Sequence, residues 1–222
     1  MKKRILTGAE IIWECLIKEG VEVVFGYPGG AILPTYDALS KYSESVHHVL
    51  TRHEQGATHM ADGYARASGK VGVAIATSGP GAANMITGLA TAMMDSSPIV
   101  CITGQVPRPA IGSDAFQEMD ISGAVIPVTK HSYLVMEIKD LAKTIKEAFA
   151  IARSGRPGPV LIDIPKDLQA EEFEFIYPEE KVTIPGENPI KSDISSVDLD
   201  SAVKMIANAK KPVILAGHGV LI

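Results

Sequence analysis

Two spacings of hydrophobic positions alternate along the chain. Between residues 7 and 20, apolar side chains recur at every third or fourth position, and Thr7 with Glu10 forms a capping box at the start. The run 71–76 is instead aliphatic at nearly every position, which is typical of a strand buried on both faces. The pattern predicts strands at 21–25, 46–50, 71–76, 99–103, 128–135 and 160–164, and helices before 20 and at 31–41, 54–67, 82–95 and 141–153.

Alternation of aliphatic strands with helices predicts an α/β fold. We expect a parallel sheet of about six strands, with helices on both faces, within residues 1–167. Residues 168–195 are rich in proline and glutamate and are interpreted as a linker that lies extended on its host. A helix at 197–207 and a buried strand at 212–216 cannot close a core alone. Residues 196–222 are therefore predicted to be the incomplete start of a second α/β domain.

The composition is that of an ordinary folded chain. Of the 222 residues, 46% are hydrophobic and 21% charged, and the formal net charge is -5. These values argue against a disordered chain and against nucleic-acid binding, which needs a basic surface. The apolar runs are far shorter than the roughly 20 residues of a membrane span, and no signal-peptide core follows the basic start. Cys15 and Cys101 stand among aliphatic neighbours, as core thiols in a reducing compartment do, so we expect a cytoplasmic protein without a membrane partner.

Two loop motifs are imperfect matches to known binding sites. Residues 79–84 resemble the dinucleotide fingerprint G-x-G-x-x-G/A, but Asn84 replaces the last small residue and no acidic residue follows the next strand. A nicotinamide site there is consequently the weakest hypothesis. His53, Glu54 and His59 resemble a zinc-protease helix, but the histidines are six positions apart rather than four, so they do not share a helix face. His47, His48 and His131 are interpreted as surface or strand-edge residues.

Glu54 stands where a predicted strand gives way to a helix. In parallel α/β sheets the ligand site lies beyond the carboxyl ends of the strands, and a carboxylate is stabilised at a helix start. Glu54 is therefore either a ligand-facing acid or an ordinary helix-start glutamate, and the local pattern leaves both alternatives open.

Eight short motifs carry a resemblance to one enzyme family. They are 25–31 (FGYPGGA), 52–55 (RHEQ), 61–66 (ADGYAR), 77–81 (TSGPG), 104–107 (GQVP), 114–118 (DAFQE), 128–131 (VTKH) and 154–159 (SGRPGP). Together they are similar to the N-terminal part of acetohydroxyacid synthase (acetolactate synthase) large catalytic subunits, which are thiamine-diphosphate enzymes. The resemblance covers the whole chain and implies the pyrimidine-binding domain of that family, followed at 196–222 by the incomplete start of its middle, FAD-binding-like domain.

The resemblance also implies roles for individual residues. Glu54 is expected to hydrogen-bond N1′ of the cofactor's aminopyrimidine and to favour its imino tautomer, with Gln117 and Gly29 as further catalytic residues. The implied thiamine-diphosphate contacts are Tyr27, Pro28, Gly30, Glu54, Pro80, Gly81 and Asn84. The implied substrate-channel residues are Ala31, Pro107, Ala115, Phe116 and Lys130. On the FAD side, the implied residues are Arg156 and Lys130.

Further cofactors and partners follow from the same resemblance. The family binds Mg²⁺ through a Gly-Asp-Gly motif, which is absent from these 222 residues, so no metal ligand is expected in this chain. FAD is expected to be bound mostly outside it. The family's active site forms between two subunits, which implies a homodimer or higher homo-oligomer, with a possible regulatory subunit. The implied reaction condenses two pyruvates, or pyruvate and 2-ketobutyrate, with loss of CO₂ in branched-chain amino-acid biosynthesis.

The sequence leaves two alternatives to this interpretation. The chain could be the pyrimidine domain of another thiamine-diphosphate 2-ketoacid decarboxylase or oxidase, although 116–118 and Lys130 favour the biosynthetic synthases. It could also be a non-catalytic oligomerisation module. Under the synthase interpretation, the 222-residue chain alone is predicted to be inactive because it lacks the diphosphate and metal ligands.

Overall fold

The computed structural model describes residues 4–184 and 196–220. The chain divides into two compact units, Met1–Ile184 and Pro185–Ile222.

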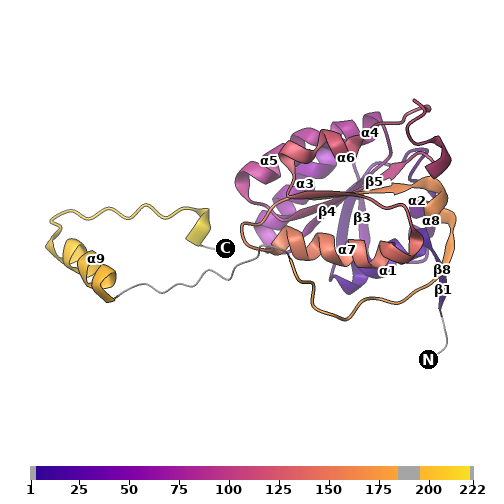
Figure 1. Ribbon diagram of the computed structural model, residues 1–222. Coiled ribbons are helices and arrows are strands. Elements are labelled where there is room, and N and C mark those ends of the chain that lie inside the picture. Colours follow the sequence, from indigo (N-terminus) through magenta and orange to yellow (C-terminus); the bar gives the residue numbers. More distant parts are fainter. Residues whose placement is uncertain (1–3, 185–195, 221–222) are drawn as a thin grey trace. The chain divides into compact units, whose positions relative to one another are not determined.

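A six-stranded parallel sheet forms the centre of the first unit (Figure 1). Its order is β3-β2-β4-β5-β7-β6, and every neighbouring pair is parallel. The predicted fold class is thus confirmed. The strands are β2 (Val23–Gly26), β3 (His47–Leu50), β4 (Gly72–Ala76), β5 (Ile99–Gln105), β6 (His131–Leu134) and β7 (Val160–Pro165). The strands β4, β5 and β7 are buried along their whole length, which explains their uninterrupted aliphatic character.

Helices cover both faces of this sheet (Figure 1). They are α1 (Gly8–Lys18), α2 (Leu33–Leu39), α3 (Glu54–Ser68), α4 (Pro80–Asn84), α5 (Ile86–Asp95), α6 (Ile121–Ala124), α7 (Ile138–Arg153) and α8 (Lys166–Ala170). One core cluster joins α1 and α7 to one face, and a second joins α3 and α5 to the other. Cys15 lies in the first cluster and Cys101 in the second, and burial raises the pKa of both thiols.

Three predicted elements differ from the structure. The helix expected at 31–41 is shorter, because the chain is still in a turn at Ala31 and enters α2 at Leu33, just before Pro34. The helix expected at 82–95 is two helices, α4 and α5, which meet at Met85. The strand expected from residue 128 begins at His131, because a 3₁₀ turn (Ile126–Val128) around Pro127 precedes it.

A second, two-stranded sheet returns the chain to its beginning. The strand β8 (Glu172–Glu174) pairs antiparallel with β1 (Ile5–Thr7), an element that the hydrophobic pattern did not predict. Phe175 and Tyr177 then pack against the core. The first part of the predicted linker therefore lies on the first unit, whereas its residues 185–195 lie outside the described part of the chain.

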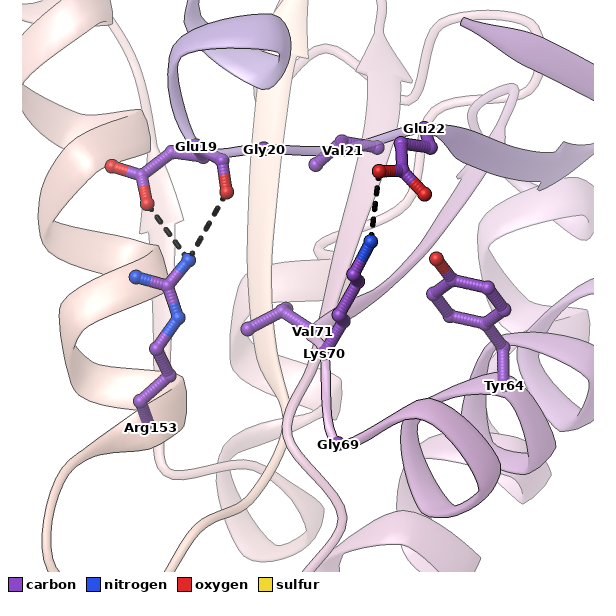
Figure 2. A pocket seen from close by; sticks show the side chains of 9 residues that line it. All are labelled: Glu19, Gly20, Val21, Glu22, Tyr64, Gly69, Lys70, Val71 and Arg153. Atoms are coloured by element: carbon purple, nitrogen blue, oxygen red, sulfur yellow. Dashed lines mark hydrogen bonds and ion pairs between the residues drawn. The ribbon is translucent and has the colours of Figure 1, made fainter.

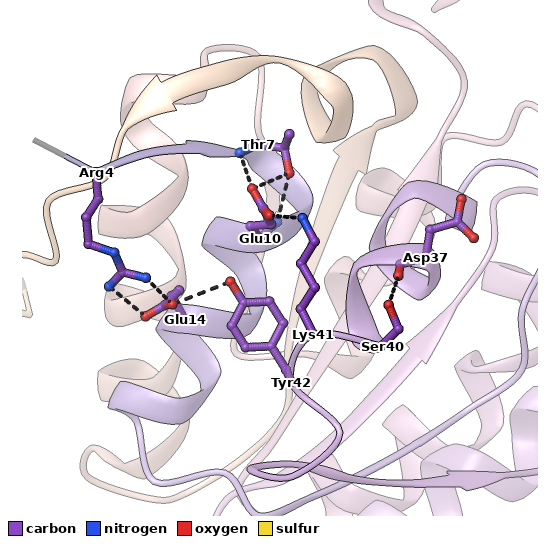
Figure 3. Close-up of polar contacts among 8 residues, drawn as sticks. All are labelled: Arg4, Thr7, Glu10, Glu14, Asp37, Ser40, Lys41 and Tyr42. Carbon is purple, nitrogen blue, oxygen red and sulfur yellow. Dashed lines mark hydrogen bonds and ion pairs between the residues drawn. The ribbon is translucent and has the colours of Figure 1, made fainter.

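The start of α1 confirms the predicted capping box (Figure 3). The Glu10 backbone amide donates to Thr7 Oγ1 over 3.2 Å, and the Thr7 amide donates to Glu10 Oε2 over 2.9 Å. Lys41, beyond α2, donates to the other oxygen of Glu10. The hydrogen bonds from Lys41 and from the Thr7 backbone lower the pKa of the Glu10 carboxyl. This cluster ties the first helix to the end of the second.

In the second unit, the structure describes α9 (Ser196–Asn208) and a 3₁₀ turn (His218–Val220). The run 212–216, predicted as a buried strand, is not a strand here. Val213, Ile214 and Leu215 are exposed. The physical reason is that a single aliphatic run needs a neighbouring strand to satisfy its backbone groups, and the described part of this unit offers none.

We expect Gly72→Ala to destabilise the first unit by about 1–3 kcal/mol. A Cβ on Gly72 would lie 2.0 Å from the backbone oxygen of Ala61 in α3, so the helix would have to move off the sheet. Gly63→Ala is the matched control, because Gly63 lies in α3 with no atom within 4 Å of its Cβ position. That control should be neutral or stabilising by up to about 1 kcal/mol. Urea unfolding measures both; equal stability of the two variants would contradict the prediction.

Candidate active site

The candidate site lies at the carboxyl edge of the sheet, where the predicted motifs follow the strands. The loop 27–32 follows β2, 77–79 follows β4, and 106–120 follows β5. Because parallel strands end on the same side, these three segments and the start of α3 meet at one edge.

Glu54 is the first residue of α3 and is only 8% exposed. The preceding residue, His53, caps the helix by accepting the Gln55 amide at Nδ1. Asn84, at the end of α4, donates its side-chain amide to Glu54 Oε2 over 2.9 Å. Among the described residues no donor reaches Glu54 Oε1. The structure thus presents a fixed, largely buried carboxylate with one oxygen available to a ligand.

Gly81 leaves room beside that oxygen. A Cβ on Gly81 would lie 3.2 Å from Glu54 Oε1 and 2.7 Å from Thr77 Cγ2. A larger residue would therefore crowd the carboxylate. Pro80 begins α4 and is exposed, and the loop 27–30 is exposed in most of its length, with Tyr27 40% exposed. Of the predicted pyrimidine-binding residues, Asn84 and Gly81 thus lie beside Glu54, whereas Tyr27, Pro28, Gly30 and Pro80 follow strands that end at the same edge of the sheet.

The loop 106–120 brings Gln117 against the 77–81 turn. Gln117 has a positive φ of 60°, and Gly79, with φ +55°, lies so close that a Cβ would be 2.6 Å from the Gln117 carbonyl oxygen. Phe116 is 88% exposed. Glu118 closes the loop on itself by accepting the backbone amides of Gly112 and Ala115, and these hydrogen bonds lower the pKa of its carboxyl. Pro107 and Ala115 belong to the same loop.

A buried polar network below this loop was not predicted. Gln105 donates its side-chain amide to the Met119 carbonyl and to Asp163 Oδ2, both over 2.8 Å. Thr103 donates to Asp163 Oδ1 over 2.7 Å. Burial raises the pKa of Asp163 to about 7 against the lowering effect of both hydrogen bonds, and nearby Asp120 raises it further. The sequence held one indication of this network, because Thr103, Gln105 and Asp163 are polar residues inside strands that are otherwise mostly aliphatic.

The structure does not bring Lys130 and Arg156 to the same edge. Lys130 precedes β6 and Arg156 precedes β7, so both lie at amino ends of the sheet. Lys130 donates to the carbonyls of Ile151 and Ser154 at the end of α7. It therefore contacts the end of a helix at the other edge of the sheet from Glu54, and its predicted place in a substrate channel stays a prediction. Lys166, which was not predicted as a site residue, follows β7 and therefore lies at the carboxyl edge.

Arg156 likewise contacts the end of a helix. Its Nε donates to Ser96 Oγ over 2.7 Å and a terminal nitrogen donates to the Met94 carbonyl over 2.9 Å, at the end of α5. A cation at this position complements the partial negative charge of a helix C-terminus.

Figure 2 shows a pocket at the opposite edge, with a cavity volume of about 420 Å³. Arg153 is paired with Glu19 at 2.9 Å and Lys70 with Glu22 at 2.8 Å, so the charged side chains that line this pocket form ion pairs with one another. Within residues 4–184 and 196–220, no group of three or more His, Cys, Asp or Glu side chains is arranged to hold a metal ion. In the same ranges, no helix is both long and apolar enough to cross a membrane.

The sequence is similar to proteins of one enzyme family. Residues 6–124 match the family model described as thiamine pyrophosphate enzyme, N-terminal TPP binding domain. Over 219 residues, or 98% of the chain, the sequence is 52% identical to a probable acetolactate synthase large subunit of Methanocaldococcus jannaschii. It is 52% identical to the acetolactate synthase large subunit of Parasynechococcus marenigrum and 51% to that of Corynebacterium glutamicum, over 97% of the chain in each case. The chain spans 36%, 35% and 34% of these relatives.

Proposed function

Because the chain belongs to the thiamine pyrophosphate enzyme family through its N-terminal TPP-binding domain, we propose that it is the N-terminal part of an acetolactate synthase large subunit. The full-length enzyme would condense two pyruvates, or pyruvate and 2-ketobutyrate, with loss of CO₂. The observation that carries the proposal is the Glu54 carboxylate, which is fixed by Asn84 on one oxygen and open to a ligand on the other.

The residues around Glu54 fit the aminopyrimidine half of thiamine diphosphate. A carboxylate oxygen accepts a hydrogen bond from a protonated ring nitrogen, and Gly81 leaves space at that oxygen. We assign Tyr27, Pro28, Gly30, Pro80, Gly81 and Asn84 to the same contact surface. The bound cofactor would supply a nucleophilic carbon and an electron sink for decarboxylating a 2-keto acid.

The chain's own residues would control protons and orientation. Glu54 would hold a proton between Oε1 and the ring nitrogen, while Asn84 prevents the carboxylate from rotating away. Gly29 would let the loop backbone pack directly on Thr77, where a Cβ would overlap that side chain, and so hold the loop near the reacting atoms. Gln117, whose backbone is held against Gly79, would donate its amide to a substrate oxygen, and Phe116 would shield that position from water. Ala31, Pro107 and Ala115 would line the approach for substrate.

Several parts of the proposal concern the rest of the enzyme. Mg²⁺ would be held by residues outside this chain, because its sequence contains no Gly-Asp-Gly motif. FAD would also be bound mostly outside it, with Arg156 as its predicted contact from this chain. A homodimer or higher oligomer, a regulatory subunit and a cytoplasmic location remain predictions.

Product analysis tests this function. We expect the full-length protein, supplied with pyruvate, thiamine diphosphate and Mg²⁺, to form acetolactate, and the 222-residue chain alone to form none. The reason is that the diphosphate and its metal need ligands beyond this chain. Acetaldehyde or acetate as the only product would favour the decarboxylase or oxidase alternative. Acetolactate formed by the purified 222-residue chain would contradict the proposed division of the site.

A further inference from the structure

We propose that Thr77 is a positioning residue, whose hydroxyl and methyl groups together fix the glycine loop 27–31 and the first turn of α4 relative to Glu54. The inference rests on the proposed function for its catalytic consequence. The contacts of Thr77 with the loop and with α4, which we call the clamp, are a property of the fold. Thr77 follows β4 and is 7% exposed.

The hydroxyl holds the glycine loop through Ala31. The backbone amide of Ala31 donates to Thr77 Oγ1 over 3.1 Å, across 46 positions of sequence. Its carbonyl accepts from Gln169 Nε2 over 2.9 Å. Ala31 is buried, so water does not readily replace either partner. Side chains from other elements therefore hold both the amide and the carbonyl of Ala31, and Thr77 supplies the acceptor for the amide.

The methyl group sets the distance between two backbone segments. A Cβ on Gly29 would lie 2.5 Å from Thr77 Cγ2, and a Cβ on Gly81 would lie 2.7 Å from the same atom. The loop and α4 thus both pack against the same methyl group. Because Gly81 also borders Glu54 Oε1, any shift at Thr77 would change the space beside the carboxylate.

The chain offers a matched control for this role. Thr129 is also 7% exposed, and its hydroxyl donates to the Val125 carbonyl over 2.9 Å. It precedes β6 and lies at the opposite edge of the sheet from Glu54. Thr129→Val therefore removes a similarly buried threonine hydrogen bond without touching the loop.

Amide hydrogen exchange in the 222-residue chain tests the clamp without any enzymatic assay. In Thr77→Val, which keeps the methyl group and removes the acceptor, the Ala31 amide should exchange about tenfold faster. In Thr77→Ser, which keeps the hydroxyl, and in Thr129→Val, it should exchange as in the wild type. Unchanged exchange in Thr77→Val would overturn the proposal. If Thr77→Val does not fold, Thr77→Ala decides, because it also lacks the acceptor: accelerated Ala31 exchange in that variant supports the proposal and wild-type exchange overturns it.

Kinetics of the full-length enzyme test the consequence. For Thr77→Val we expect kcat to fall by about 10²-fold, the effect of a misplacement of about 1 Å, with little change in KM for the 2-keto acid. Thr77→Ser, which keeps the acceptor but lacks the methyl group, should recover only part of the rate, and Thr129→Val should leave it unchanged. Equal loss in Thr77→Val and Thr129→Val would overturn the positioning role. Failure of the proposed function would appear differently, as absence of acetolactate in the wild type, and Ala31 exchange would still report on the clamp.

Discussion

Glu54→Gln in the full-length enzyme is expected to lower the rate of acetolactate formation by about 10²–10⁴-fold, the usual range for a positioned proton-transfer group. Glutamine has nearly the same volume and still accepts one hydrogen bond, but it cannot hold a proton as a carboxylate does. The Asn84 amide would then donate to the oxygen of a neutral amide and no longer to a carboxylate oxygen. Initial rates from pyruvate at saturating thiamine diphosphate measure the loss.

A control separates this effect from a general loss of charge. Glu22→Gln removes an exposed carboxylate that is paired with Lys70 at the other edge of the sheet, and it should leave the rate unchanged. Proton exchange at C2 of the bound cofactor, followed by NMR, gives the sharper comparison. Exchange at the wild-type rate in Glu54→Gln would show that Glu54 has no part in activating the cofactor.

Asp163 should make the stability of the first unit depend on pH between about 4 and 7. Its pKa is raised from 3.8 to about 7 in the folded chain, mainly by burial. In this range the folded state binds more protons than the unfolded state, so the free energy of unfolding falls as pH rises. Since one pKa unit corresponds to about 1.4 kcal/mol, the contribution lost between pH 4 and pH 8 is about 4 kcal/mol.

Asp163→Asn isolates this contribution from other titrating groups. Asparagine can still accept from Gln105 and can donate to the Thr103 hydroxyl, but it carries no charge at any pH. We expect the wild type to lose stability relative to this variant as pH rises, measured by urea unfolding of the 222-residue chain at several pH values. Parallel curves for the two proteins would contradict the prediction, and carbon-13 NMR of the Asp163 carboxyl would give its pKa directly.

The sheet was predictable because burial of a strand on both faces requires apolar residues at nearly every position. The strands β4, β5 and β7 contact apolar side chains above and below, so nearly every position in them is aliphatic. The capping box of Thr7 and Glu10 was equally local, since all its atoms lie within one helical turn. In contrast, β1 and β8 have three residues each and pair across more than 160 positions, so neither has a pattern of its own.

The candidate site was predictable in part. Glu54 could be placed at the ligand-facing edge because a strand-to-helix junction in a parallel sheet always lies there. Its partner Asn84 was predicted only through a family resemblance, and the hydrogen bond between the two spans 30 positions. Lys130 was predicted through the same resemblance, and its ammonium contacts the end of α7, so its role in a substrate channel stays a prediction.

The sequence by itself determined the fold class, most of the strands and helices, and the edge on which Glu54 lies, because hydrophobic periodicity and capping act over a few residues. Only the tertiary structure decided which polar atoms meet. The Ala31 amide donates to Thr77, and the Gln105 side-chain amide donates to Met119 and Asp163. The glycines at 79 and 81 leave room for a neighbouring backbone and for a carboxylate. Such contacts follow from strand order and helix packing, and these depend on the whole chain because each hydrogen bond joins segments that only the closed core brings together.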